Sequence, residues 1–375
     1  MRSAFTLALL LVACDDRAPA PEPWAWELPA GFPEPYVPVN NPMSAAKVEL
    51  GRHLFYDERL SHNQTMACAS CHEQARAFTD GKAKGEGSTG HVLPRSAMSL
   101  ANVAYFSIYT WANPKLADLE TQALVPLFAD FPLELGAQQD TAEILARFAA
   151  DPDYPAMFAA AFPDDDNPFT TERIVQAISS FERTLISGDA PYDRFVYALD
   201  DDALSPAAQR GMALFFGERA ECYHCHAGPN FSTSFRSATS EAGPPDFQNN
   251  GLYNLDPAGA YPPGNGGLFE FTGDPRDQGK FRVPSLRNIA VTAPYMHDGS
   301  LATLADVVDH YAAGGTVTPA GPNAGDGRNN PNKSPLVRPF DLAADERADL
   351  VAFLDSLTDE GFLSDPRFAS PFDAP

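Results

Sequence analysis

Apolar residues recur at helical spacing in six stretches of the chain, and these stretches predict its regular structure. In the first of them, Leu50, Leu54 and Phe55 lie on one side of an expected helix. Asp140, followed by Glu143, has the pattern of an N-cap with its capping-box partner. No stretch alternates polar and apolar residues as a strand does, so we expect a mainly α fold. The expected helices span residues 45–56, 140–150, 171–186, 205–216, 303–312 and 343–357.

The same local order occurs twice along the chain. A helix is expected directly before a cysteine-rich motif at 45–56 and again at 205–216. Together with a length of 375 residues, this repetition predicts two related domains, at 42–200 and 201–366. The segment from 227 to 284 is rich in Gly, Pro and Asn and is expected to be a long irregular loop.

Composition and charge narrow the class of partner. The chain is 44% hydrophobic, as a folded protein is, and its 35 prolines indicate much irregular structure. Its formal net charge is −24, which disfavours nucleic acid and anionic membrane surfaces as partners. A positively charged protein would be attracted to this surface, whereas a neutral small molecule would not be steered toward it.

The N-terminus has the pattern of an export signal. Arg2 precedes an apolar run from Ala4 to Ala13 that is too short to span a bilayer. Residues 11–14, Leu-Val-Ala-Cys, resemble the lipobox of bacterial lipoproteins, which predicts a signal at 1–14 and a lipid on Cys14; an ordinary cleaved signal is the alternative. Both interpretations place the protein outside the cytoplasm, in the periplasm. Under the first interpretation, the lipid is the only contact with the membrane. Residues 15–41 are Pro-rich and suit a stiff tether.

Cysteine and histidine occur together in two short motifs. Residues 68–72 read Cys-Ala-Ser-Cys-His, and residues 222–226 read Cys-Tyr-His-Cys-His. In such C-x-x-C-H motifs the two thiols bind one porphyrin covalently and the histidine ligates its iron. Zinc sites and redox disulfides also use paired cysteines, but neither requires a histidine directly after the second one. The sequence therefore predicts two haem c groups, held by Cys68, Cys71 and His72 and by Cys222, Cys225 and His226.

These motifs and the stretches between them resemble the bacterial di-haem cytochrome c peroxidase/MauG family, over nearly all of residues 43–366. Residues 93–105 and 111–126 are in addition similar to the MbnH-like members, which are associated with methanobactin-type copper systems. The stretches that carry the resemblance are Ser-Leu-Ala-Asn-Val-Ala-Tyr at 99–105, Leu-Glu-Thr-Gln-Ala at 119–123, Pro-Leu-Glu-Leu-Gly at 132–136, Pro-Ser-Leu-Arg-Asn at 284–288 and Thr-Ala-Pro-Tyr-Met-His-Asp-Gly at 292–299.

The resemblance implies that hydrogen peroxide meets the first haem. Glu134 would lie over that haem, where a partly buried carboxylate can move the proton that peroxide cleavage requires; an ordinary surface glutamate is the alternative. Gln122 and Pro126 are implied to line the same pocket. His91 lies in a loop where peroxidase members carry a removable iron ligand, and a surface histidine is an equally open interpretation.

The resemblance also implies that the second iron ligand separates the subfamilies. Peroxidase members use a methionine on the helix after the turn at 292–299, and MauG-type members use a tyrosine, which here matches Tyr311. Helical spacing agrees, because Tyr311 continues an apolar face while His310 shares a face with Asp306; a buried core tyrosine is the alternative. A thioether favours reduced iron, whereas a phenolate stabilises high-valent iron, so a bis-Fe(IV) state is implied. The apolar face contains Leu304, Val307, Val308 and Tyr311.

Two further elements follow from the same resemblance. Trp111 is implied to relay electrons between the haems, with a packed core tryptophan as the alternative. Asn102, with the carbonyls of Thr292 and Pro294, is implied to bind one calcium ion, which prefers oxygen ligands of these kinds.

The expected function is therefore that of a MauG/MbnH-like oxidoreductase, which uses peroxide to oxidise a side chain on a partner protein. The expected side chain is tryptophan. The resemblance points to a secreted copper-binding, MbnP-like protein as that partner. A cytochrome c peroxidase that reduces peroxide with electrons from a small cytochrome is the enzymatic alternative. An electron-transfer protein without catalysis is the third.

Overall fold

The computed structural model describes residues 24–240, 243 and 246–372. The expected signal at 1–14, Cys14 and the first part of the tether lie outside the described residues. Within the described part of the chain, no helix combines the length and the apolar character needed to cross a bilayer.

The observed elements make the described fold mainly α, with two short antiparallel strand pairs, β1–β2 and β3–β4. The α-helices are α1 (Ala45–Tyr56), α2 (Leu119–Phe128), α3 (Thr141–Ala149), α4 (Tyr154–Ala161), α5 (Thr171–Glu182), α6 (Pro191–Tyr197), α7 (Pro206–Phe215), α8 (Phe269–Thr272), α9 (Leu304–Ala312), α10 (Ala344–Asp355) and α11 (Glu360–Ser364). The strands are β1 (Phe247–Gln248), β2 (Phe281–Arg282), β3 (Val317–Thr318) and β4 (Gly325–Asp326).

Most helix predictions hold, and two details differ. Helix α5 ends at Glu182, before the expected 186, because the chain turns there through bonds such as Thr184 N to the Phe181 carbonyl (2.8 Å). Asp140 does precede α3, but its side chain caps nothing. Its carboxylate instead contacts Nδ1 of His62, so the expected capping box does not form.

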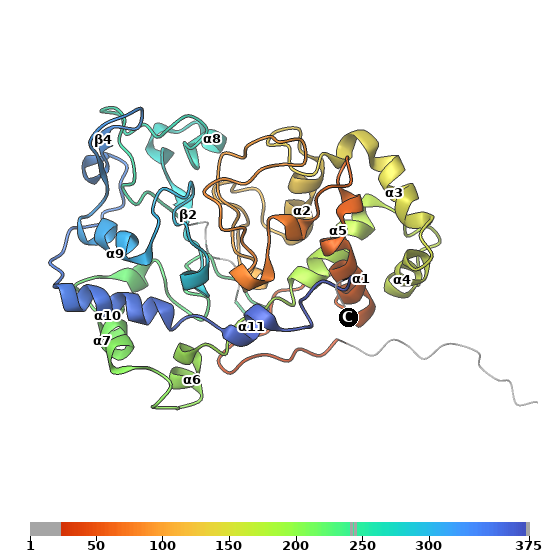
Figure 1. The fold of residues 1–375 in the computed structure, drawn as a ribbon, viewed down its shortest axis with the longest axis horizontal. Helices are drawn as coiled ribbons and strands as arrows, with labels where there is room; N and C mark the ends of the chain where they lie inside the picture. The colour runs from red at the N-terminus through yellow and green to blue at the C-terminus, as the bar shows by residue number, and fades with distance from the viewer. Residues whose placement is uncertain (1–23, 241–242, 244–245, 373–375) are drawn as a thin grey trace, which may run out of the picture.

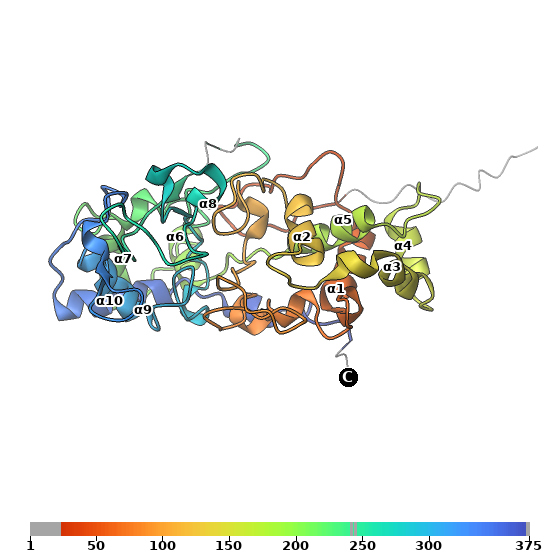
Figure 2. The ribbon, with the colours of Figure 1, turned by 90° about the horizontal axis from the view of Figure 1, so that it is seen from above.

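Two separate hydrophobic cores organise the molecule, and the two halves lie side by side along its long axis (Figures 1 and 2). The first core is built around the packing of α1 on α5, and the second around α7 on α10. Each pair meets at a glycine. A Cβ on Gly51 would lie 1.9 Å from the Ala177 carbonyl oxygen, and one on Gly211 would lie 1.9 Å from the Asp349 carbonyl oxygen. The repeated sequence order therefore corresponds to a repeated helix crossing before each cysteine motif.

The C-terminal end of the chain returns to the first half of the molecule. Helix α11 lies between the halves, and the described chain after it runs back to the first half (Figure 1). Phe362 and Phe368 join the first core. Gln74 Nε2 donates to the Phe362 carbonyl (3.1 Å), and the Tyr56 hydroxyl donates to the Phe368 carbonyl (2.7 Å). The last part of the chain thus ties the two halves together.

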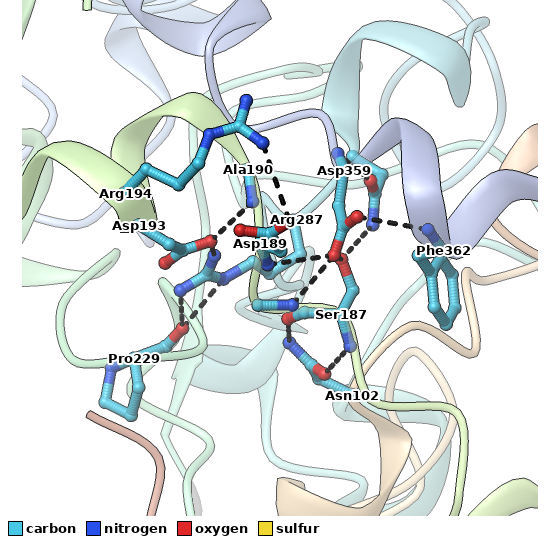
Figure 3. A network of polar contacts seen from close by, with 12 residues as sticks. Asn102, Ser187, Asp189, Ala190, Asp193, Arg194, Pro229, Arg287, Asp359 and Phe362 are labelled. Atoms are coloured by element: carbon cyan, nitrogen blue, oxygen red, sulfur yellow. Dashed lines mark hydrogen bonds and ion pairs between the residues drawn. The ribbon is translucent and has the colours of Figure 1, made fainter. Parts of the chain in front are cut away.

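A buried polar network fixes the junction between the halves (Figure 3). The Asn102 carboxamide exchanges two hydrogen bonds with the backbone of Ser187, at 2.7 and 2.9 Å. Asp359 Oδ2 accepts from the Ser187 hydroxyl (3.2 Å) and from Gly188 N (2.9 Å). Segments from three parts of the sequence therefore meet at one point, which holds the two cysteine motifs in a fixed relation.

Candidate haem centres

Both cysteine motifs lie on short 3-10 turns, Cys68–Ser70 and Cys222–His224. Cys68 packs against the first core and Cys222 against the second. The four cysteines of the motifs are free thiols, and because the pairs belong to different cores they do not form one four-cysteine zinc site. Burial is the main cause that raises the pKa of every one of these thiols, to about 11 for Cys71 and Cys225. An uncharged thioether suits such surroundings better than a thiolate does.

The histidines that follow are oriented as iron ligands. Nδ1 of His72 donates to the Phe78 carbonyl (2.7 Å), and Nδ1 of His226 donates to the Phe231 carbonyl (3.0 Å). A carbonyl only accepts, so each bond fixes the tautomer and leaves the Nε2 lone pair free for a metal. Burial lowers the pKa of His72 and lowers that of His226 to about 4, so both rings are neutral near pH 7.

A large cavity adjoins the second motif. It holds ≈ 1840 Å³ of space not filled by protein, its open mouth included. Cys222, Cys225 and His226 line it together with Tyr311, and the rest of its wall is mostly apolar. Two thiols, one imidazole and one phenol around such a space fit a covalently held haem with two protein ligands. Leu304, Val307 and Val308 line the same cavity, so α9 turns the face predicted from its spacing toward it.

Tyr311 is the residue on this wall that was expected to be the second iron ligand. Burial raises the pKa of the Tyr311 phenol to about 12, and a hydrogen bond from the Asn250 side chain opposes that rise. An amide donor directed at the phenol oxygen stabilises its anion, which is the form that ligates iron. His310 is also buried, unlike a residue on an outward face, because Nδ1 bonds to Thr316 Oγ1 (2.7 Å) under the following turn.

A carboxyl group with a raised pKa, that of Glu134, lies beside the first motif. Burial raises the pKa of Glu134 to about 7, and the charge of Glu134 in turn raises the pKa of both Cys68 and Cys71. The turn that carries Glu134 is held on both sides. Its carbonyl accepts from Ser88 N (2.8 Å), and Leu135 N donates to the Pro126 carbonyl (2.9 Å). A half-protonated carboxyl near pH 7 can both accept and donate a proton.

The other residues expected at the first site fall into two groups. Gln122 and Pro126 lie one turn apart on α2, and Pro126 bonds to the turn of Glu134 as described. His91 lies in the loop that packs on the same turn, with its ring 5.6 Å from that of Phe131. Among the described residues, none of the hydrogen bonds or ring contacts of His91 involves the first motif, so its role as a ligand stays a prediction.

Glu182 is a residue at the first site that the sequence did not single out. It is buried at the end of α5, and burial raises its pKa to about 8. Its charge raises the pKa of the Cys68 thiol, which places the two groups near each other. The sequence did contain a sign of its importance: Glu182 directly follows Phe181 on an apolar helix face, where a charged residue is unexpected.

The structure gives positions for the residues that were expected to lie between the two haems. Trp111 lines the second cavity and donates from Nε1 to the Ser96 carbonyl (2.9 Å). Thr292 and Pro294 line that cavity as well. Asn102 is fully buried, and Oδ1 accepts one hydrogen bond from Ser187, which leaves that oxygen a second lone pair.

The chain is mainly α and has two C-x-x-C-H motifs in separate cores, each with a neutral histidine held by a backbone carbonyl. These features define the class of c-type cytochromes with two haems. The family model for di-haem cytochrome c peroxidases matches residues 45–201. The methylamine utilization protein MauG of Methylorubrum extorquens is 33% identical over 324 residues, which are 86% of this chain and 81% of MauG. The cytochrome-c peroxidase IdrP1 of Denitromonas iodatirespirans is 34% identical over 352 residues, 90% of this chain and 88% of IdrP1.

A crystal structure of a MauG-like protein associated with microbial copper homeostasis is also similar. It shares 52% sequence identity with this chain, covers 93% of it and 99% of its own length, and gives a TM-score of 0.91. The chain belongs to the di-haem cytochrome c peroxidase/MauG family and is a haem-dependent, peroxidase-type oxidoreductase. The family implies two haem c groups, in agreement with the two motifs.

Proposed function

We propose that this protein uses hydrogen peroxide to oxidise a side chain of a partner protein, as a MauG/MbnH-like enzyme. The observation that carries the proposal is the place of Tyr311, which lines the same cavity as Cys222, Cys225 and His226. Met296, on the turn before α9, also lines this cavity, but its sulfur is 3.2 Å from Asn250 Nδ2. A phenolate favours oxidised iron and a thioether favours reduced iron, so Tyr311 suits storage of oxidising equivalents.

The residues of the first site would then manage protons. Bound haem supplies the iron that takes two oxidising equivalents from peroxide. The overall reduction, H₂O₂ + 2H⁺ + 2e⁻ → 2H₂O, takes its electrons from the partner. Glu134, with a pKa of about 7, accepts a proton from one peroxide oxygen and delivers it to the departing one. Gln122 and Pro126 would line this pocket, and His91 would be either a displaceable ligand or a surface residue.

The partner would be oxidised from a distance. Its electrons would pass through Trp111, which lines the second cavity and is fixed through the Ser96 carbonyl. The similarity to a MauG-like protein associated with microbial copper homeostasis supports a secreted copper-binding, MbnP-like partner. Tryptophan would be the oxidised side chain, as the resemblance to MbnH-like members implies. The product would be of the kynurenine type, which takes two such turnovers per tryptophan: Trp + 2H₂O₂ → N-formylkynurenine + 2H₂O.

Location and calcium complete the proposal. The apolar N-terminal run and Cys14 support a periplasmic protein anchored by a lipid. Asn102, Thr292 and Pro294 would bind calcium through oxygen atoms, and none of the described residues donates a hydrogen bond to the Thr292 or Pro294 carbonyl. The domains would divide at 42–200 and 201–366, with the C-terminal segment crossing between them.

Mass spectrometry of candidate partners tests the proposal. The holoprotein, the partner and peroxide are incubated together, and the partner is digested and sequenced. Oxidation of one tryptophan with the wild type, and its loss with Tyr311→Phe, is the expected result. Partners that stay unchanged in mass while peroxide is consumed would rule the proposal out.

The alternative function is that of a cytochrome c peroxidase, and the similarity to IdrP1 supports this alternative. Rapid, peroxide-dependent oxidation of a reduced small cytochrome would select this alternative. A chain that only transfers electrons would respond to peroxide at neither haem.

A further inference from the structure

Arg282 is a buried cation in the wall of the second haem cavity. It ends strand β2, is 3% exposed, and lines the cavity with Cys222, His226 and Tyr311. Its backbone N–H donates to the Trp111 carbonyl (2.8 Å). The guanidinium is therefore held on rigid backbone next to both the second motif and Trp111.

The contacts of the guanidinium are all with uncharged groups. Nε donates to the Thr110 carbonyl (3.0 Å) and Nη2 to the Met98 sulfur (3.3 Å). The central carbon lies 4.0 Å from the centre of the Phe106 ring. Nη1 is buried and has no hydrogen-bond partner within the part of the chain that the structure describes. A donor of this kind is unsatisfied, and such atoms are rare in folded proteins unless a ligand takes them.

Two other buried arginines show what is missing. Arg183 and Arg287 are as deeply buried as Arg282, and each has a carboxylate partner, Glu120 at 2.7 Å and Asp193 respectively. Because Arg183 Nη1 also has no hydrogen-bond partner among the described residues, the carboxylate is what distinguishes these two arginines from Arg282. Among the described residues, no carboxylate pairs with Arg282, and burial lowers its pKa to about 9. A buried charge without a counter-ion is strongly unfavourable, so the assembled protein requires an anion at this point.

We propose that Arg282 binds a propionate carboxylate of the haem attached to Cys222 and Cys225, and raises that haem's reduction potential. The propionates are the anions that a haem brings into its cavity, and a guanidinium fork pairs with a carboxylate through two hydrogen bonds. Reduction adds negative charge at the iron, so a nearby cation makes the iron easier to reduce. Arg282 is thus a positioning residue that counters the potential-lowering effect of Tyr311. The inference rests on haem attachment to the second motif and not on the oxidised partner.

Spectroelectrochemistry of the two-haem protein tests the proposal. Arg282→Gln removes the charge, Arg282→Lys keeps it without the fork, and Arg276→Gln makes the same change of net charge at an exposed site away from the cavity. The EPR signals of the diferric protein assign each midpoint potential to its haem. The expected result is a lower potential for the second haem in Arg282→Gln, a smaller decrease in Arg282→Lys, and no change in Arg276→Gln.

Two results would overturn the proposal: an Arg282→Gln protein that titrates like the wild type, or a shift confined to the first haem. If Arg282→Gln fails to retain both haems, resonance Raman spectra of Arg282→Lys carry the test. A shifted propionate-bending band supports the ion pair, and an unchanged band refutes it. Failure of the partner-oxidation assay would leave these readouts intact, so the two proposals fail separately.

Discussion

At the scale of single residues, the chemistry depends on how burial changes a few side chains. Glu134, His226 and Tyr311 are ordinary residue types whose pKa values are displaced mainly by desolvation. Burial disfavours the charged form, so it keeps the imidazole neutral and brings a carboxyl group near neutrality. The two motifs therefore have different surroundings, with a titratable acid at the first and a phenol at the second.

The rate of reaction with peroxide should rise with pH through about 7. Glu134 must be ionised to accept the first proton, and its pKa is raised to about 7, so the active form increases as the pH passes that value. Stopped-flow measurements of the first haem would show this profile. Glu134→Gln should be slower by about 10²–10⁴-fold and nearly independent of pH in this range. A mutant with the wild-type profile would assign the titration to another group, with Glu182 the first to examine.

At the scale of elements, close helix crossings place the motifs. Helix α7 can approach α10 because Gly211 has no side chain, and α1 approaches α5 in the same way at Gly51. The helix that leads into each motif is thereby fixed against its core.

Gly211→Ala should destabilise the protein by about 1–3 kcal/mol, because its Cβ would clash with the Asp349 carbonyl and force the helices apart. In a helix without such a close neighbour, the same change would stabilise the protein by about 1 kcal/mol. The sign of the change in unfolding free energy therefore shows whether the crossing is tight. Thermal unfolding of the holoprotein measures it, with Ala213→Ser on the exposed side of α7 as the control. A stabilised mutant would show that the crossing is not tight.

The junction network makes a second prediction at this scale. Asp359→Asn keeps the shape of the side chain but removes the charge that accepts from Ser187, Gly188 and Asp189. We expect a loss of about 1.5–3 kcal/mol in unfolding free energy, since each bond to a charged acceptor is stronger than a neutral one. Faster hydrogen exchange at 187–190 should accompany the loss. Unchanged exchange there would mean that the junction is held by other contacts.

The sequence predicted those features that depend on residues close together in the chain, such as a binding motif or the apolar face of one helix. Each motif needs only five consecutive residues, and the periodicity of α9 predicts the face that lines the cavity. The choice of Tyr311 as a ligand came from the family resemblance and stays a prediction. Arg282 and Asn250 could not be found this way, because they lie in or at the end of irregular chain whose contacts arise only after folding. Asp359 is likewise an unremarkable acid until the C-terminal segment folds back to the junction. The long loop was expected, but not the strand that fixes Arg282.

At the scale of the whole molecule, charge distinguishes the two reactants. A net charge of −24 attracts a basic partner surface over several ångströms, whereas peroxide is neutral. Oxidation of the partner should therefore slow as salt shortens the screening length from about 10 Å at 0.1 M to about 3 Å at 1 M. The peroxide reaction of the first haem should not change. Equal salt dependence of both steps would contradict steered docking.

The most direct test of the central claim is EPR and optical spectroscopy of the diferric protein before and after one equivalent of peroxide. We expect one high-spin haem and one low-spin haem with an oxygen ligand from Tyr311, both changing together without added reductant. Tyr311→Phe should lose the response of the second haem while the first still reacts. A sulfur or nitrogen ligand on the second iron, or a response at the first haem alone in the wild type, would contradict the account.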